Sequence, residues 1–423
     1  MTLPTSPSSP ADDAAPVEVA PPSRPRRRPA PPAHPFFRFL FPLLVVVAGV
    51  AVVLLWREGA KAVLDTTDGT DVAAVDDPAA PGFLAFATPT PTLLVAHVDE
   101  ADRLTGVTVL ARTSLDEGGN LVVFSPDMLV ELSEGGVILG PEYERGGGDA
   151  LEAALGEYLG FGFTEKEPTI MSEERLATFL ALVEPIPYFL TDDLVRADAD
   201  GVEEVVYGSG FAQFTGLELA EIFGWRNPSE RDAGRFTRQL AIWEAWLAQI
   251  GEADDLFGAT LPFVEGLPPY LRALGTGTAS LELAPANAVD FDPDNPFYAL
   301  APGNEDWPIE KGREMVPVPI GYAPGVWPTV QLLDGTGDAD TRNAFLPAVV
   351  AAGAEIVVVG NALAFDVAET SVVYHDILDE DRARALGDSL GVPVRFEEDL
   401  DQPAQLTVTV GADSADLLAR VRE

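Results

Sequence analysis

The most apolar stretch of the chain lies near its N-terminus. Residues 39–56 read FLFPLLVVVAGVAVVLLW and carry no charged side chain, and Arg38 and Arg57 bracket them. A bilayer core needs about 20 apolar residues in a helix, and aromatic side chains such as that of Trp56 favour the membrane interface. The pattern predicts a transmembrane helix over residues 36–57. The alternative is a long signal peptide, but 35 residues precede the run and no small-residue cleavage pattern is evident.

The residues on either side of the predicted helix indicate its orientation. Residues 1–35 are rich in Pro, Ala and Ser, with a basic run over 24–28, and this composition does not fold alone. The basic run and Arg38 thus stand on the N-terminal side of the apolar run, and only Arg57 and Lys61 stand on the other. Because positive charge gathers on the cytoplasmic side, we expect a disordered cytoplasmic tail, a signal-anchor in the cell membrane and extracellular main domains. Residues 58–90, rich in Asp, Thr, Ala and Pro, are expected to form an extracellular linker.

Strands precede helices in the next stretch, which we expect to form a first domain over residues 91–284. β-Branched runs separated by turn residues predict strands at 92–98, 107–112 and 120–125. Helices with apolar residues three or four apart are expected to follow the caps Asp149, Ser172 and Thr215. Thr215 and Glu218 form a capping-box pair. The longest helix is expected from about residue 230 to 250, with a buried stripe of Phe236, Leu240, Trp243, Leu247 and Ile250.

A second alternation of strands and helices fills the last part of the chain. Residues 285–328 are rich in Gly and Pro and are expected to form a linker. Beyond this linker we expect a C-terminal domain over residues 329–423, with strands at 330–333, 355–359, 371–374 and 405–410 and helices at 341–352 and 379–390. The expected fold class is α/β (α+β): a transmembrane helix, a first domain with a central sheet flanked by helices, and a small C-terminal α/β domain.

The composition excludes several classes of function. The formal net charge of -42 repels polyanions, so a nucleic-acid partner is not expected. The chain has no cysteine, which excludes disulfides, thiolate catalysis and zinc-thiolate sites. His34, His97 and His375 are its only histidines, so neither a histidine-rich metal site nor a Ser-His-Asp hydrolase is expected.

Arginine is concentrated on one helix face of this acidic chain. At about 100° per residue, Arg231, Arg235 and Arg238 fall within about 60° of one another, away from the apolar stripe. Gln239 lies beside Arg235, and Arg226 lies in the preceding loop. Guanidinium groups bind phosphate oxygens in bidentate fashion and stay charged, so this cluster is a candidate phosphate or pyrophosphate site. The alternative is that the arginines pair with nearby acids, which include Glu221, Glu230 and Asp232.

Other polar residues are weaker candidates for chemistry. Asp99, Asp102 and Asp127 are candidate magnesium ligands, since a hard cation that bridges phosphates prefers carboxylate oxygen. Acidic residues are so abundant that chance proximity explains them equally well. The glycine run 146–148 could hold an anion at a helix N-terminus, or be a flexible loop. Leu333–Asp338 lacks the full dinucleotide-binding spacing and is interpreted as a turn.

Two stretches resemble the LytR-CpsA-Psr family, membrane-anchored enzymes that move glycopolymers from undecaprenyl-pyrophosphate carriers onto peptidoglycan. DAGRFTRQ, residues 232–239, is similar to the family's Asp-x-x-Arg-x-x-Arg-Gln helix motif, and residues 215–226 resemble the approach to it. Residues 330–362, with SVVYHD and LTVTVGAD, resemble the LytR C-terminal accessory domain of actinobacterial members. The resemblance implies that the phosphate-binding residues are Arg226, Asp232, Arg235, Arg238 and Gln239.

The chain departs from the family's pattern in its early strands. The family's Arg-x-Asp motif binds pyrophosphate and magnesium, and at the matching place this sequence has Leu104, Thr105 and Gly106. Where the family has Ser-x-Pro-Arg-Asp, this sequence has Ser125, Pro126, Asp127 and Met128. The metal aspartate and two arginines are therefore missing. Without the metal ion, the charge that develops in phosphoryl transfer loses its main source of neutralisation.

Two functions follow from the resemblance and its gaps. The first is a catalytically weakened or inactive member that binds or scaffolds in the cell envelope. The alternative is an active phosphotransferase that moves a glycopolymer to peptidoglycan, with Mg²⁺ as cofactor and Asp99 or Asp102 as the replacement ligand. The implied partners are a polyprenyl-phosphate-linked polymer or peptidoglycan at a membrane, and a protein partner is a further hypothesis for the C-terminal domain.

Overall fold

The computed structural model describes residues 75–113, 118–198, 201–228, 230, 232–253, 266–289 and 297–421. The predicted tail and transmembrane helix, residues 1–57, lie outside this part of the chain. Within the described residues, no helix is both long enough and apolar enough to cross a membrane.

The first domain is built on a five-stranded mixed sheet with apolar residues on both faces. Its strand order is β12 (Thr278–Leu283), β4 (Gly118–Phe124), β3 (Leu104–Arg112), β2 (Thr92–Val98) and β7 (Thr169–Ser172). The three predicted strands form its antiparallel centre, and β12 and β7 add to the edges in parallel. Because both faces of the sheet are covered, β2 and β4 are buried at every position rather than at alternate ones.

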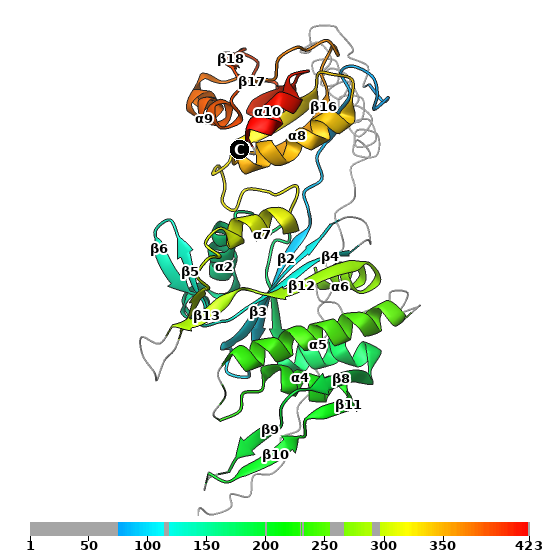
Figure 1. The fold of residues 1–423 in the computed structure, drawn as a ribbon, viewed down its shortest axis with the longest axis vertical. Helices are drawn as coiled ribbons and strands as arrows, with labels where there is room; N and C mark the ends of the chain where they lie inside the picture. Colours follow the sequence, from blue (N-terminus) through cyan, green and yellow to red (C-terminus); the bar gives the residue numbers. More distant parts are fainter. Residues whose placement is uncertain are drawn as a thin grey trace, which may run out of the picture. The chain divides into compact units, whose positions relative to one another are not determined.

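Helices cover the two faces of this sheet and enclose one hydrophobic core on each side (Figure 1). One face packs against α3 (Glu173–Leu180), α4 (Gly216–Gly224), α5 (Asp232–Glu252) and α6 (Leu267–Thr276). The other packs against α2 (Leu139–Leu159) and α7 (Trp307–Met315). Antiparallel ribbons complete the domain: β5 (Leu129–Leu132) with β6 (Gly135–Ile138), β8 (Ile186–Leu190) with β11 (Gly210–Phe214), and β9 (Leu194–Ala197) with β10 (Glu203–Tyr207).

The predicted helix starts are confirmed where a side-chain cap defines them. The Ser172 side chain accepts a hydrogen bond from the N–H of Arg175, and Thr215 and Glu218 form the predicted capping box. α2 extends further than expected, because its backbone continues through a kink at Gly147, where φ is 67°. The predicted helix after Asp149 is the part of α2 beyond this kink.

The stretch 285–328 differs from the linker that its Gly and Pro content predicts. It contains the ribbon β13 (Ala286–Val289) with β14 (Phe297–Leu300), and α7. Met315 and Val316 are buried in the core beneath the sheet. Proline near the start of α7 is compatible with a helix, so proline content alone did not exclude one. The first domain therefore continues to residue 316.

The C-terminal domain has the predicted alternation of strands and helices. Its six-stranded sheet has the order β1 (Leu84–Phe86), β16 (Glu355–Asn361), β15 (Thr329–Asp334), β19 (Leu406–Val410), β17 (Ser371–Tyr374) and β18 (Val394–Phe396). The helices α8 (Ala339–Ala351), α9 (Glu380–Leu390) and α10 (Ser414–Val421) contribute to its core. β18 and α10 were not predicted, since each is short.

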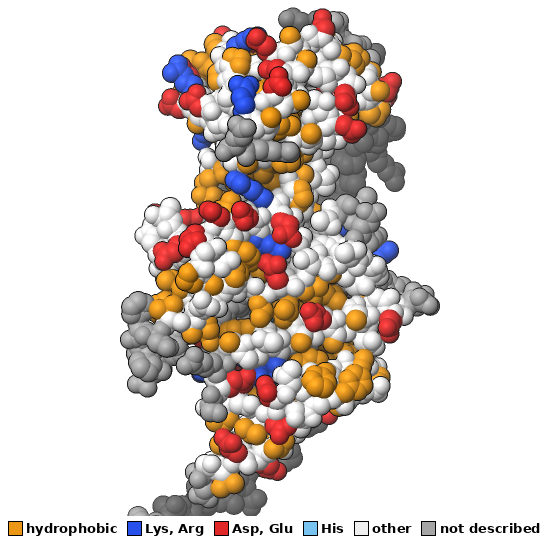
Figure 2. Space-filling view, in the orientation of Figure 1, with side chains coloured by type: hydrophobic (Ala, Val, Ile, Leu, Met, Phe, Trp, Pro, Cys, Tyr) orange, Lys and Arg blue, Asp and Glu red, His pale blue; other side chains and the backbone are white. Residues whose placement is uncertain are grey.

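One strand of this sheet comes from the stretch of sequence that precedes the first domain. β1 lies within the stretch 58–90 that was expected to be a linker, and it pairs antiparallel with β16. A three-residue strand gives no sequence signal, and only its partner, some 270 residues later, makes it a strand. On the face that Figure 2 shows, Asp and Glu side chains are scattered over both domains.

Candidate functional site

α5 carries the arginines that the sequence singled out, and it places them in different surroundings. Arg238 is only 3% exposed. Its guanidinium binds the Glu230 carboxylate through both terminal nitrogens, with one N–O distance of 2.9 Å, and donates to the carbonyl oxygen of Trp225 at 2.7 Å. The alternative of an internal salt bridge therefore holds for Arg238, which fastens α5 to the loop after α4.

The carboxylate of Glu230 is charged because of these contacts. Burial by itself would raise its pKa, but hydrogen bonds from Arg238 and the N–H of Asn227, with the charges of Arg238 and Arg235, bring the pKa below its ordinary value. The pair is therefore ionised at neutral pH and is largely shielded from water.

Gln239 is fully buried and has a structural role. Its amide nitrogen donates to the carbonyl oxygens of Thr105, at 3.1 Å, and Phe223, at 3.2 Å, and so joins β3 to the end of α4. Directly opposite stands Gly106, the residue at the place of the family's metal aspartate. A Cβ atom on residue 106 would lie 2.6 Å from the Gln239 Oε1 atom. The Gln239 amide thus fills the space that a carboxylate at position 106 would need.

Arg226 and Arg235 meet at a cavity of about 510 Å³. A third arginine, Arg103, lines the same cavity, as do Asp99, Asp127 and Glu144. Neither Arg238 nor Gln239 is among its lining residues. Asp232 begins α5, and its side chain lies outside what the structure describes. Of the five implied phosphate-binding residues, the structure brings Arg226 and Arg235 together at one opening.

Arg103 is the site residue that sequence reasoning missed. It binds Asp99 through two nitrogens, at 2.9 and 2.7 Å. Burial opposes ionisation of Asp99, but the hydrogen bonds from Arg103 and from the N–H of Ala101 hold its pKa below the usual range. Arg103 directly precedes Leu104, where the family motif has arginine. An arginine one residue away from the position of the motif arginine was the sequence feature that could have identified Arg103 as a candidate.

The described residues do not form a metal site of the expected kind. Asp99 is bound to Arg103, and Asp102 accepts a hydrogen bond from the Tyr143 hydroxyl at 3.1 Å. Asp127 lines the cavity, but in the described part of the chain no group of three Asp, Glu or His side chains could hold a metal ion. With Gln239 against Gly106, the residues present do not fit a magnesium ion at the family's position.

A second cavity of about 490 Å³ adjoins the first and shares Asp99, Thr105, Gly224 and Arg226 with it. Apolar side chains such as that of Phe223 are part of its lining. His97 reaches it from β2, and burial lowers the pKa of this imidazole to about 3, so His97 is neutral. Arg196 covers the Trp225 ring at 5.1 Å and pairs with Glu221 at 3.0 Å.

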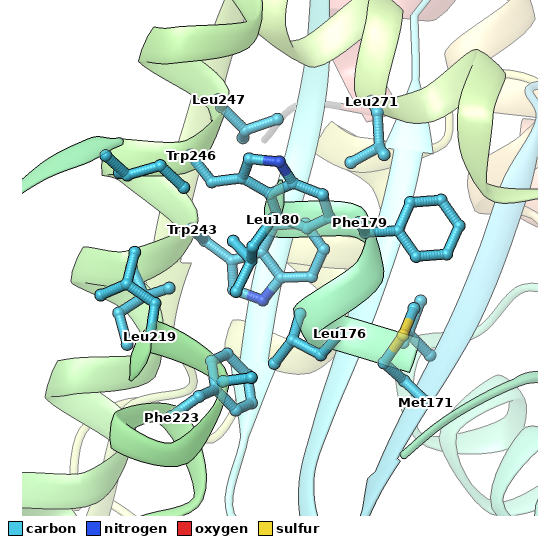
Figure 3. Close-up of a cluster of buried hydrophobic side chains, with 14 of the residues drawn as sticks. Met171, Leu176, Phe179, Leu180, Leu219, Phe223, Trp243, Trp246, Leu247 and Leu271 are labelled. Atoms are coloured by element: carbon cyan, nitrogen blue, oxygen red, sulfur yellow. The ribbon is translucent and has the colours of Figure 1, made fainter. Parts of the chain in front are cut away.

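Phe223 belongs to the core between the sheet and the helices α3 to α6, and this core also contains large aromatic side chains. Trp243 and Trp246 of α5 are each 1% exposed, and their ring centroids lie 4.9 Å apart. Figure 3 shows the two indoles between Phe179 and Leu180 of α3 on one side and α5 on the other. The apolar interior between helices and sheet is therefore occupied by the protein's own side chains at this point.

Comparisons with known proteins add a likeness of structure. No family model and no curated protein sequence matches the chain. Solved structures do: a LytR-Csp2A-Psr enzyme from Actinomyces oris is 15% identical, with 56% of this chain and 98% of that chain covered and a TM-score of 0.39. Bacillus subtilis TagV is 14% identical, covering 54% and 98%, with a TM-score of 0.40. The family protein YwtF (TagT) with bound octaprenyl pyrophosphate lipid is 11% identical, covering 54% and 91%, with a TM-score of 0.39.

Two of these three structures carry the LytR-Cps2A-Psr name. All three TM-scores lie below 0.5 and all three identities below 25%, so this likeness carries no conclusion about the function of the chain.

Proposed function

We propose that this protein is a single-pass, membrane-anchored component of the cell envelope that binds a phosphate-bearing polymer precursor without transferring it. The N-terminal tail is cytoplasmic in this proposal and both folded domains are extracellular. The cavity lined by Arg103, Arg226 and Arg235 supports the binding part, because three guanidinium groups at one opening suit phosphate oxygens.

The contact between Gly106 and Gln239 carries the claim that transfer does not occur. In the resembled family the residue at position 106 would be the metal-binding aspartate. Here the Gln239 amide occupies that space and is held there by two hydrogen bonds. Phosphoryl transfer depends on groups that neutralise developing charge, and both a metal ligand and the Arg238 guanidinium are withdrawn from the cavity.

One observation favours the alternative of an active phosphotransferase. Asp99 and Asp127 line the same cavity as Arg226 and Arg235, so two carboxylates lie within reach of a bound phosphate. Rearrangement of the Asp99–Arg103 pair on binding would release one carboxylate for a magnesium ion.

One experiment separates these functions. The full chain is placed in lipid nanodiscs, and its binding and turnover of a polyprenyl pyrophosphate are measured with and without Mg²⁺. We expect binding, at least tenfold weaker binding by Arg235→Ala, and no release or transfer of phosphate. Arg384→Ala is the matched control, since this exposed arginine pairs with Glu380 on α9. Magnesium-dependent transfer that Arg235→Ala abolishes would establish the alternative, and absence of binding would refute both.

The anchor is tested separately. Reporter proteins fused before residue 36 and after residue 423 should be active in the cytoplasm and outside the cell, respectively. Release of the C-terminal reporter into the medium would instead point to a cleaved signal peptide.

A further inference from the structure

Asn361, at the end of β16, holds a segment that lies far away in the sequence. Its side chain is 4% exposed, and its amide nitrogen donates to the carbonyl oxygens of Pro78, at 2.9 Å, and Ala80, at 2.8 Å. Its backbone N–H donates to the carbonyl oxygen of Phe83 at 2.8 Å. One residue therefore makes three hydrogen bonds to the segment 78–87, which Figure 1 shows in blue beside β16.

Gly360 lets this segment approach closely. It faces Leu84 in the antiparallel register of β1 and β16. A Cβ atom on residue 360 would lie 2.2 Å from the carbonyl oxygen of Phe83 and 2.7 Å from a methyl carbon of Leu84. Each of these neighbours belongs to the segment 78–87, so the absence of a side chain at 360 serves this contact and not the core.

Two large apolar side chains of the segment point to solvent: Leu84 is 49% exposed and Phe86 is 83% exposed. Phe83 is half-buried, and Ala87 packs against the core of the C-terminal domain. Backbone bonds from Gly82 to Ala362, at 3.0 Å, and from Ala87 to Val357, at 3.0 Å, complete the attachment. Because Asn361 alone supplies three of the hydrogen bonds to the segment, the attachment depends strongly on it.

We propose that Gly360 and Asn361 form a strap site that fastens residues 78–87, here called the strap, to the C-terminal domain. The strap covers the edge of β16, which would otherwise present unpaired N–H and C=O groups. The Gly-Asn pair of the stretch that resembles the accessory domain thereby has a structural purpose. The C-terminal domain is completed by residues that come before the first domain.

The strap changes which domain the N-terminal anchor is attached to, a consequence that rests on the proposed anchor. Without it, the first domain would be the first folded unit after the anchor along the chain. With the strap bound, a segment of the C-terminal domain comes first, and β2 of the first domain follows it.

Amide hydrogen exchange of the full chain tests the strap site. We expect Asn361→Ala and Gly360→Ala to raise the exchange rate of a peptide covering residues 78–87 at least tenfold, with β2 unchanged. Asn343→Ala and Gly208→Ala are the matched controls: Asn343 is exposed on α8, and a Cβ atom at 208 would meet nothing within 4 Å. Unchanged exchange in both strap variants would overturn the proposal.

A cross-link decides the question even if these variants fail to fold. The chain has no native cysteine, so Ala85→Cys with Val359→Cys, which are register partners, leaves a single possible disulfide. We expect complete cross-linking under mild oxidation, and little for Ala85→Cys with Val357→Cys, whose register is displaced by two residues. Failure of the first pair to cross-link in the folded protein would refute the strap. If this disulfide forms but the reporter fusions show no membrane anchor, the strap stands and only its consequence for the anchor is refuted.

Discussion

At the scale of single residues, the candidate site depends on which polar groups are already engaged within the protein. Arg238 and Gln239 match the family motif as closely as Arg235 does, yet both are buried and bonded to their own chain. Arg235 lies at the cavity. The motif therefore did not distinguish the arginine that lines the cavity from the residues that are buried and bonded within the protein.

The contact between Gly106 and Gln239 gives a prediction about stability. Gly106→Asp should destabilise the protein by about 1–3 kcal/mol, because a side chain there overlaps the Gln239 amide. Gly106→Asp combined with Gln239→Ala should lose less stability than the sum of the two single changes, as expected for groups in contact. Urea denaturation of the four proteins of this cycle measures the coupling, and strict additivity would contradict the proposed overlap.

The buried pair of Arg238 and Glu230 gives a prediction about pH. Arg238→Ala should cost about 3–5 kcal/mol at pH 7, since it leaves a shielded carboxylate without its partner. The folded pKa of Glu230 lies below its ordinary value of 4.5, so its contribution is present above 4.5 and is lost as the pH falls through the folded value.

The difference in unfolding free energy between the wild type and Arg238→Ala should therefore shrink below pH 4.5. Denaturant titrations at a series of pH values measure it. Arg384→Ala, which breaks an exposed pair, should cost at most about 1 kcal/mol at pH 7. An Arg238→Ala effect that stays constant to pH 3 would show that the pair contributes through packing and not charge.

At the scale of elements, α5 both packs against the core and lines the cavity. Its apolar stripe was readable from the sequence: Phe236, Trp243, Leu247 and Ile250 are buried as predicted, whereas Leu240 is only half-buried. Trp246 is buried as well, which widens the stripe beyond the predicted positions. Arg235 lies at the edge of this widened stripe, about 20° from Trp246 at about 100° per residue, and lines the cavity.

Replacement of a stacked indole in this core should be costly. Trp243→Ala should destabilise the protein by about 3–5 kcal/mol, because the surrounding side chains close only partly over the space it leaves. Leu217→Ala, at a residue that is 65% exposed on α4, should change stability by no more than about 0.5 kcal/mol. Equilibrium denaturation compares the two, and equal effects would contradict the tight packing seen around Trp243.

At the scale of the whole molecule, the C-terminal domain is built from two separate stretches of the sequence. The chain contributes β1 to the C-terminal domain, then forms the first domain, and then returns. The two cores of the first domain use residues from Leu93 to Val316, so they do not include the C-terminal domain.

A chain that ends at Pro328 should therefore keep a folded first domain. We expect this protein to unfold cooperatively on heating, as measured by tryptophan fluorescence, and we expect Trp243 and Trp246 to remain buried in its folded state. In the same protein residues 78–87 should lose their exchange protection, because their partner β16 is absent. Loss of cooperative unfolding would show that the first domain depends on the C-terminal one.

Local patterns determined much of this protein. The alternation of strands and helices, the capping residues Ser172 and Thr215, and the helix that carries the arginines follow from neighbours within a few residues, where propensity and periodicity act. The sequence likewise determined the high negative charge, the lack of cysteine and the apolar run 39–56 that predicts an anchor.

Only the tertiary structure decided what depends on distant partners. β1 is a strand because β16 lies beside it, Gln239 is structural because Gly106 faces it, and Arg103 belongs to the site because the cavity brings it to Arg226 and Arg235. Edge pairing, close approach and burial are properties of pairs of residues that the chain brings together, and no local pattern encodes them. The sequence predicted a phosphate site on one helix, and folding decided that Arg235 lines a cavity while Arg238 is buried.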